Sequence, residues 1–115
     1  MAYMDGFMAA VKTAQKDEYK AFAEFAAGVF KDHGALGLIE CWGDDVPDGK
    51  LTSFPMAVRL EEDETVVLSW IRWPDKETRN AGHDAVFNDA RMVNAEMPFD
   101  GSRMIFGGFE LLMEA

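Results

Sequence analysis

The sequence contains one cysteine, Cys41, among its 115 residues. A single thiol cannot form a disulfide within the chain, and a reducing compartment is its simplest setting. Hydrophobic residues make up 49% of the chain, enough for a core that needs no disulfide or metal to hold it. We therefore predict a single domain over residues 1–115, located in the cytoplasm.

The sequence also lacks long apolar runs and has few basic residues. No apolar run approaches the roughly 18 residues of a membrane helix, and the first residues lack the pattern of a secretory signal. Lysine and arginine number 11 against 21 aspartates and glutamates, which gives a formal net charge of −10. Because nucleic acids bind Lys/Arg-rich surfaces, we predict neither a nucleic acid nor a membrane as partner.

Hydrophobic periodicity divides the chain into six main elements. Strands are predicted at residues 3–11, 36–42, 65–73 and 103–113, and helices at 16–33 and after Pro74, with Asp75 as N-cap. The strand at 65–73 is apolar on both faces and should be central in a sheet. Residues 54–58 are interpreted as a short extended segment.

The order strand, helix, strand, strand, helix, strand is the split βαβ pattern of ferredoxin-like folds. We therefore predict an α+β fold with a four-stranded antiparallel sheet and two helices on one face. The other face would expose a larger apolar patch than monomers usually carry. A homodimer formed through that face is the predicted assembly.

Two adjacent glycines, Gly107 and Gly108, interrupt the last predicted strand. Glycine weakens a strand, and a pair within one is typical of a bulge or of a close approach by another group. We expect one of these features in the last strand.

Four segments of the chain are distinctive: AYMDGF at 2–7, ECWGDDVPDGK at 40–50, VVLSWI at 66–71 and PFDGSRMIFGGF at 98–109. Together they resemble a bacterial family of conserved hypothetical proteins of unknown function in the dimeric α/β-barrel superfamily. The resemblance implies a ferredoxin-like subunit whose sheet packs against a second copy. It also implies kinship with cofactor-free monooxygenases, heme-handling proteins and stress-induced proteins, but it brings no catalytic residues.

Five polar or amphipathic residues lie on predicted strands: Asp5, Glu40, Trp42, Trp70 and Arg103. We take Asp5, Glu40 and Arg103 as candidate catalytic residues, and Trp42, Trp70 and Arg103 as candidate ligand-binding residues. Arginine can bind a carboxylate through two hydrogen bonds, and an apolar cleft can raise a carboxyl pKa enough for acid–base work. Arg103 is expected to be mostly buried and paired with Asp5 or Glu40, either structurally or beside a ligand.

Other reactive side chains are interpreted as structural. His33 and His83 fall on predicted helices, which should lie outside a barrel, so neither is expected to hold heme. Cys41 has apolar neighbours and is predicted to be a buried, inert thiol. No metal and no cofactor is predicted, because one acidic cluster does not have the spacing of an EF-hand and reads as a turn: Glu40, Asp44, Asp45 and Asp48.

These observations favour a protein that binds a small organic molecule in a cleft beside the sheet. Whether it transforms that molecule, in a cofactor-free monooxygenase-like or isomerase-like reaction, stays open. The alternative is a non-enzymatic dimeric stress or interaction protein with no ligand site. RNA binding would need exposed aromatic residues beside basic ones on the sheet, which the composition disfavours.

Overall fold

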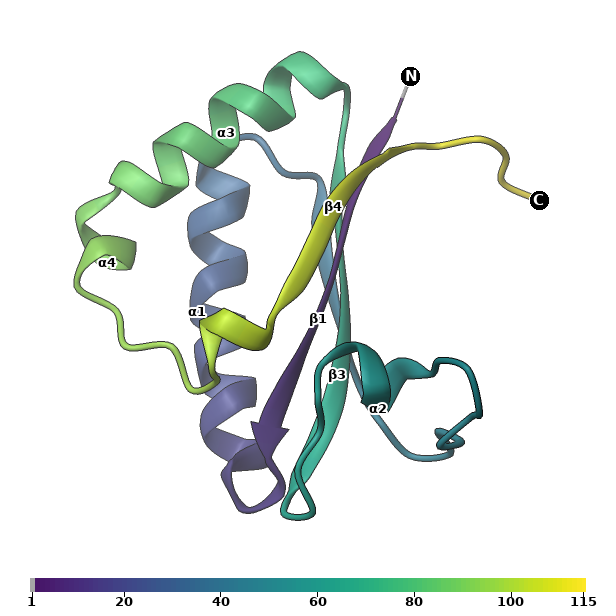
Figure 1. The fold of residues 1–115 in the computed structure, drawn as a ribbon. Coiled ribbons are helices and arrows are strands. Elements are labelled where there is room, and N and C mark those ends of the chain that lie inside the picture. Colours follow the sequence, from purple (N-terminus) through teal and green to yellow (C-terminus); the bar gives the residue numbers. More distant parts are fainter. Residues whose placement is uncertain (1) are drawn as a thin grey trace.

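Strands and helices follow one another in the predicted order in the computed structural model, which describes residues 2–115 (Figure 1). The strands are β1 (Tyr3–Lys12), β2 (Gly37–Trp42), β3 (Glu64–Trp73) and β4 (Ile105–Glu110). The helices are α1 (Lys16–Asp32), α2 (Phe54–Ala57), α3 (Lys76–Asn88) and α4 (Ala90–Val93). Single 3₁₀ turns occupy Thr13–Gln15 and Gly101–Arg103.

The four strands form one antiparallel sheet in the order β2-β3-β1-β4. This arrangement confirms the predicted α+β, ferredoxin-like fold and the central place of β3. In the register, Asp5 of β1 lies opposite Ile71 of β3 and Gly108 of β4. Glu40 of β2 lies opposite Ser69 of β3. Asp5, Glu40 and Ser69 return in the site described below.

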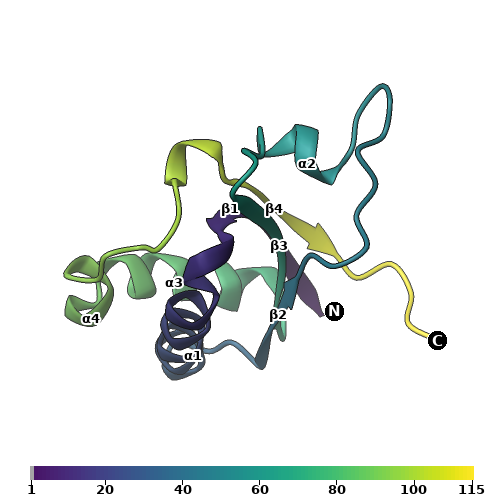
Figure 2. The ribbon, with the colours of Figure 1, turned by 90° about the horizontal axis from the view of Figure 1, so that it is seen from below.

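The main helices cover one face of the sheet. Figure 2 shows α1, α3 and α4 on one side of the strands, and α2 with its flanking loops on the other. Alternate residues of each strand point towards the helices, and the buried core lies there, with Ala9, Val67 and Trp73 fully inaccessible to solvent. None of the helices in residues 2–115 is both long and apolar enough to cross a bilayer.

Local sequence signals set the helix boundaries. Asp75 is the N-cap of α3, as predicted, and its carboxylate accepts the backbone N–H of Thr78 at 2.7 Å. The buried stripe of α1 has three- and four-residue spacing and consists of Tyr19, Ala23, Ala26 and Val29.

Gly82 allows α3 to lie against the sheet. A Cβ atom at this position would overlap the ring of Trp73 and would lie 2.8 Å from the carbonyl oxygen of His33. The helix backbone therefore rests directly on Trp73, which fixes where the next residue, His83, meets the sheet.

Three local predictions are corrected. The last strand begins at Ile105 rather than at residue 103, because Asp100 caps a 3₁₀ turn by accepting the N–H of Ser102. Residues 54–57 form helix α2 rather than an extended segment, because the side chain of Ser53 accepts the N–H of Met56. Cys41 is exposed rather than buried, because its side chain lies on the face away from the main helices.

The paired glycines behave differently from each other. The ladder between β1 and β4 runs regularly through both, so the predicted bulge is absent. The close approach is confirmed at Gly108, where a Cβ atom would lie 2.5 Å from the hydroxyl oxygen of Tyr3 and 2.9 Å from a guanidinium nitrogen of Arg79. Gly108 thus leaves room for the side chains that surround Asp5.

Candidate functional site

A cavity of about 240 Å³ lies between the helix-facing side of the sheet and the helices α1, α3 and α4. Its wall is almost entirely apolar, and six phenyl rings contribute to it: Phe7, Phe22, Phe30, Phe87, Phe99 and Phe106. Phe87 and Phe106 are both more than half exposed, so the cavity opens to solvent between α3 and β4. Two carboxyl groups, Asp5 and Glu40, also reach its wall.

The carboxylate of Asp5 is surrounded by nitrogen donors. Its Oδ1 accepts from Arg79, at 3.0 Å from Nε and 2.8 Å from Nη2. Its Oδ2 accepts from the indole N–H of Trp73 at 2.8 Å and lies 2.6 Å from Nε2 of His83. Both oxygens therefore have partners.

These donors keep Asp5 ionised. Burial alone would raise its pKa, but the hydrogen bonds from His83, Arg79 and Trp73 outweigh burial and hold the pKa below its ordinary value of 3.8. An ionised carboxylate can only accept hydrogen bonds, so Nε2 of His83 carries the hydrogen. In the neutral imidazole, Nδ1 is then left with a free lone pair.

The carboxyl group of Glu40 has only hydroxyl partners. Its Oε1 accepts from the hydroxyl of Tyr19 at 2.6 Å and from the hydroxyl of Ser69. Burial raises the pKa of Glu40, although both hydrogen bonds act in the opposite direction. Burial and the contact with Glu40 also raise the pKa of Tyr19, which keeps its phenol protonated and donating.

The sheet holds these two groups at a fixed separation. Asp5 and Glu40 lie on β1 and β2, which flank β3, and the register offsets them by two residues. Strand spacing and rise then place their Cα atoms about 12 Å apart. A molecule in the cavity therefore meets carboxyl groups from two different strands of the sheet.

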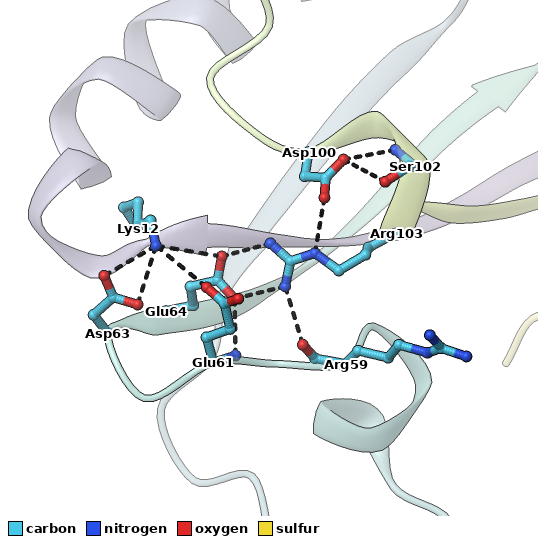
Figure 3. Close-up of polar contacts among 8 residues, drawn as sticks. All are labelled: Lys12, Arg59, Glu61, Asp63, Glu64, Asp100, Ser102 and Arg103. Carbon is cyan, nitrogen blue, oxygen red and sulfur yellow. Dashed lines mark hydrogen bonds and ion pairs between the residues drawn. The ribbon is translucent and has the colours of Figure 1, made fainter.

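Arg103 lies outside this cavity. Its guanidinium makes two hydrogen bonds of 2.7 Å to the oxygens of Glu64, one of 3.0 Å to Asp100 and one to the carbonyl oxygen of Arg59 (Figure 3). Its side chain is 19% exposed, so burial and carboxylate pairing are confirmed. The predicted partners, Asp5 and Glu40, are wrong, because the 3₁₀ turn directs the side chain to the start of β3.

The Arg103 cluster joins three distant segments. Lys12 lies beside it, 3.0 Å from Asp63 and 4.0 Å from Glu64 (Figure 3). Hydrogen bonding to Arg103 lowers the pKa of Glu64 to about 2. The cluster therefore fastens the segment before β4 to the ends of β1 and β3, and four of the five N–H donors of Arg103 have partners within it.

The two tryptophans that the sequence singled out also lie away from the cavity. Trp42 packs near Tyr19, with ring centroids 6.5 Å apart, and lines a shallower groove along β2. Trp70 points to the opposite face of the sheet, where it is 38% exposed. A ligand-binding role for either remains a prediction.

The structure adds five residues to the candidate site: Tyr19, Ser69, Trp73, Arg79 and His83. His83 lies on a helix, as predicted, and reaches the cavity because α3 packs on that side of the sheet. Arg79 and His83 are four residues apart and therefore share a helix face. This spacing, together with a carboxylate on the apolar face of β1, is the signal that could have found them. Among residues 2–115, no three His, Cys, Asp or Glu side chains form a group that could hold a metal ion.

Comparison with known proteins now places the chain. Residues 2–101 match the family described as "Protein of unknown function (DUF1428)". The chain belongs to this family. The resemblance drawn from the sequence is thereby confirmed.

Close relatives match the chain over nearly its whole length. "Uncharacterized protein YbaA" of Escherichia coli strain K12 is 52% identical over 116 residues, which cover 99% of each chain. A protein of the same description from Shigella flexneri matches equally well.

Two solved structures share the fold at low sequence identity. A dimeric ferredoxin-like protein from an uncultured marine organism superposes with a TM-score of 0.58 at 12% identity and covers 100% of both chains. Rv0793 from Mycobacterium tuberculosis superposes with a TM-score of 0.55 at 10% identity, over 100% of this chain and 99% of its own.

Proposed function

We propose that the protein binds a small, largely apolar organic molecule in the cavity between the sheet and helices α1, α3 and α4. The observation that carries this proposal is the aromatic cavity of about 240 Å³ with two carboxyl groups, Asp5 and Glu40, in its wall. Ligand sites are typically apolar and have a few polar groups that orient the ligand. The sequence also suggested a cleft beside the sheet, but it favoured the space between the two sheets of a dimer, whereas this cavity lies on the helix side of the sheet.

The size of the cavity favours a ligand site over a packing defect. Protein interiors are close-packed and contain few voids larger than a water molecule. An apolar cavity of about 150 Å³ is already large enough to bind benzene. The present cavity of about 240 Å³ is larger and opens to solvent beside Phe87 and Phe106, so a one- or two-ring molecule can enter it.

A filled-cavity variant tests the proposal. Tetralin, a bicyclic hydrocarbon, should raise the unfolding temperature of the wild-type protein, because a ligand at 100 times its Kd adds about 2.7 kcal/mol of stability. Ala26 is buried in α1 and lines the cavity, so Ala26→Phe should abolish the shift. Ala21→Phe, on the exposed side of the same helix, is the matched control and should keep it. No shift with the wild-type protein, or an equal shift with Ala26→Phe, would contradict the proposal.

The face of the sheet away from α1, α3 and α4, called the open face below, supports a second proposal, a homodimer. Between Arg72 at one end of this face and Lys12 and Glu64 at the other, the strand positions carry no charge, although the chain has a net charge of −10. Several large apolar side chains there are exposed: Ile39, Trp70, Ile105 and Phe109. A second copy offers the same uncharged surface, whereas two faces of the same charge would repel. The dimeric description of one structural neighbour agrees with this assembly.

Light scattering in solution tests the dimer. The wild-type protein should have the mass of two chains at micromolar concentration. Ile39→Glu, which puts a charge in the middle of the open face, should shift the mass to one chain. Phe25→Glu replaces an exposed apolar residue of α1 and should leave the dimer intact. A monomeric wild-type protein would show that something other than a second copy meets the open face.

A further inference from the structure

We propose that the cavity is a proton-transfer site for enolisable ketones, in which His83 removes a proton beside the carbonyl group and Glu40 protonates the carbonyl oxygen. This inference rests on the proposed function, because the ketone must occupy the same cavity. It goes further by naming the substrate class, the base and the acid.

The geometry around His83 suits a base. Its Nε2–H donates to the ionised Asp5, which leaves Nδ1 as the acceptor. No residue within 2–115 forms a hydrogen bond to Nδ1, and no fully buried polar side-chain atom there lacks a partner, so Nδ1 retains some exposed surface. His83 lines the cavity, where Phe30 and Phe87 pack against its ring. The imidazole is therefore held in place with its lone pair open.

His83 is not needed to neutralise Asp5. Arg79 supplies a charged partner to Oδ1, and Trp73 supplies a hydrogen bond to Oδ2. A purely structural carboxylate would be satisfied by these two residues. The added contact with His83 instead fixes the tautomer of the imidazole, so Asp5 acts as a positioning residue for the base.

The geometry around Glu40 suits an acid. Tyr19 and Ser69 both donate to Oε1, so the proton of the neutral carboxyl group is directed to Oε2. No residue within 2–115 pairs with Oε2, which, like Nδ1 of His83, retains some exposed surface, and Glu40 lines both this cavity and the groove along β2. Burial also raises the pKa of Glu40, which favours the protonated form. Enzymes that carry out acid–base chemistry often hold two ionisable groups whose surroundings shift their pKa values in opposite directions. Here Glu40 is the acid, and Asp5 positions His83 as the base.

The step balances without a cofactor. The C–H bond next to the carbonyl group breaks, its proton goes to Nδ1 of His83, and its electron pair becomes the C=C bond of an enol. The C=O π pair moves to oxygen, which takes the proton of Glu40. When His83 returns its proton to the same carbon, the enol C=C pair forms the new C–H bond, the O–H proton goes back to the Glu40 carboxylate, and the ketone is regenerated. In a β,γ-unsaturated ketone the intermediate is a dienol, and return of the proton to the γ carbon, again with the O–H proton going to Glu40, gives the conjugated isomer.

Deuterium exchange measures this step without knowledge of the natural substrate. β-Tetralone has the bicyclic frame of tetralin with an acidic C–H beside its carbonyl group. In D₂O, the wild-type protein should accelerate loss of that proton signal in NMR above the buffer rate. His83→Gln should lower the protein-dependent rate by about 10²-fold or more. Binding of β-tetralone, followed by tryptophan fluorescence, should persist.

Two further variants keep the test decisive. His33→Gln alters the other histidine, which contacts Asp89 at 2.9 Å and does not line the cavity, and should exchange at the wild-type rate. Glu40→Gln retains an acceptor for Tyr19 and Ser69 but has no acidic proton, and should also lose about 10²-fold. It serves as the readout if His83→Gln does not fold.

The outcomes separate the two proposals. Binding of tetralin and β-tetralone without accelerated exchange would overturn the proton-transfer site and leave the ligand cavity standing. Exchange at the wild-type rate in His83→Gln would also overturn it. If neither tetralin nor β-tetralone binds, both the ligand cavity and the proton-transfer site are overturned.

Discussion

Asp5 and Glu40 are both strand carboxyl groups that point to the same face of one sheet, yet the structure treats them in opposite ways. Asp5 meets a guanidinium, an indole N–H and an imidazole N–H, and its pKa falls. Glu40 meets two neutral hydroxyls, and burial raises its pKa. Burial acts to raise both pKa values, and only at Asp5 do the hydrogen bonds from its nitrogen donors outweigh it.

The comparison also separates two kinds of contribution to stability. An ionised carboxylate paired with Arg79 forms a buried ion pair, and breaking one side of it leaves an uncompensated charge. The bonds of Glu40 to Tyr19 and Ser69 are side-chain contacts to neutral groups, which a neutral amide can replace. The two sites should therefore respond very differently to the same chemical change.

Replacing each carboxyl group by its amide gives the largest expected contrast. Asp5→Asn leaves Arg79 without a carboxylate and should lower the free energy of unfolding by about 3–5 kcal/mol. Glu40→Gln still accepts the two hydroxyl hydrogen bonds and should change it by no more than about 1 kcal/mol. Urea denaturation at neutral pH compares the two variants with the wild-type protein. Equal losses would show that the two carboxyl groups are energetically alike.

The next largest effect concerns the contact between Gly82 and Trp73, which positions α3 so that Arg79 and His83 reach Asp5. Gly82→Ala places a methyl group against Trp73 and the carbonyl of His33, and overpacking of this kind costs about 1–3 kcal/mol. Gly28 of α1 has open space around it, so Gly28→Ala should stabilise the protein by up to about 1 kcal/mol. Thermal unfolding of both variants gives the comparison, and stabilisation by Gly82→Ala would contradict the close contact.

The alternation of residues along β1 predicts which face of the sheet Asp5 lies on, but not which side chains it contacts. Alternation along β1 placed Asp5 among Tyr3, Phe7, Ala9 and Val11, and so on the buried face. Its partners depend on the rotation of α3 about its own axis, which is set by the contact of Gly82 with Trp73 rather than by any local pattern.

Arg103 shows the same limit. The cost of burying a charge correctly predicted a carboxylate partner. Which carboxylate it meets depends on the 3₁₀ turn that Asp100 caps, and this turn aims the side chain at Glu64. Without the turn, a strand beginning at residue 103 would have carried the guanidinium elsewhere.

The smallest expected effect is the pH dependence of Glu40. Because its pKa is higher in the folded protein than its ordinary value of 4.5, the folded state binds this proton more tightly than the unfolded state does. Stability therefore falls as the pH rises from about 4.5 through the raised pKa, and is constant above it. Asp5 has a lowered pKa, so its contribution is lost only as the pH falls below about 3.8, outside this window.

Glu40→Gln isolates that contribution, because the amide does not titrate. The free energy of unfolding of the wild-type protein minus that of Glu40→Gln should decrease as the pH rises from 4.5 towards neutrality and then level off. Urea denaturation of both proteins across this range, at constant ionic strength, gives the difference directly. A difference that increases with pH would mean that Tyr19 and Ser69 stabilise the ionised carboxylate more than burial disfavours it. Glu40 would then resemble Asp5, and the assignment of Glu40 as the acid would fail.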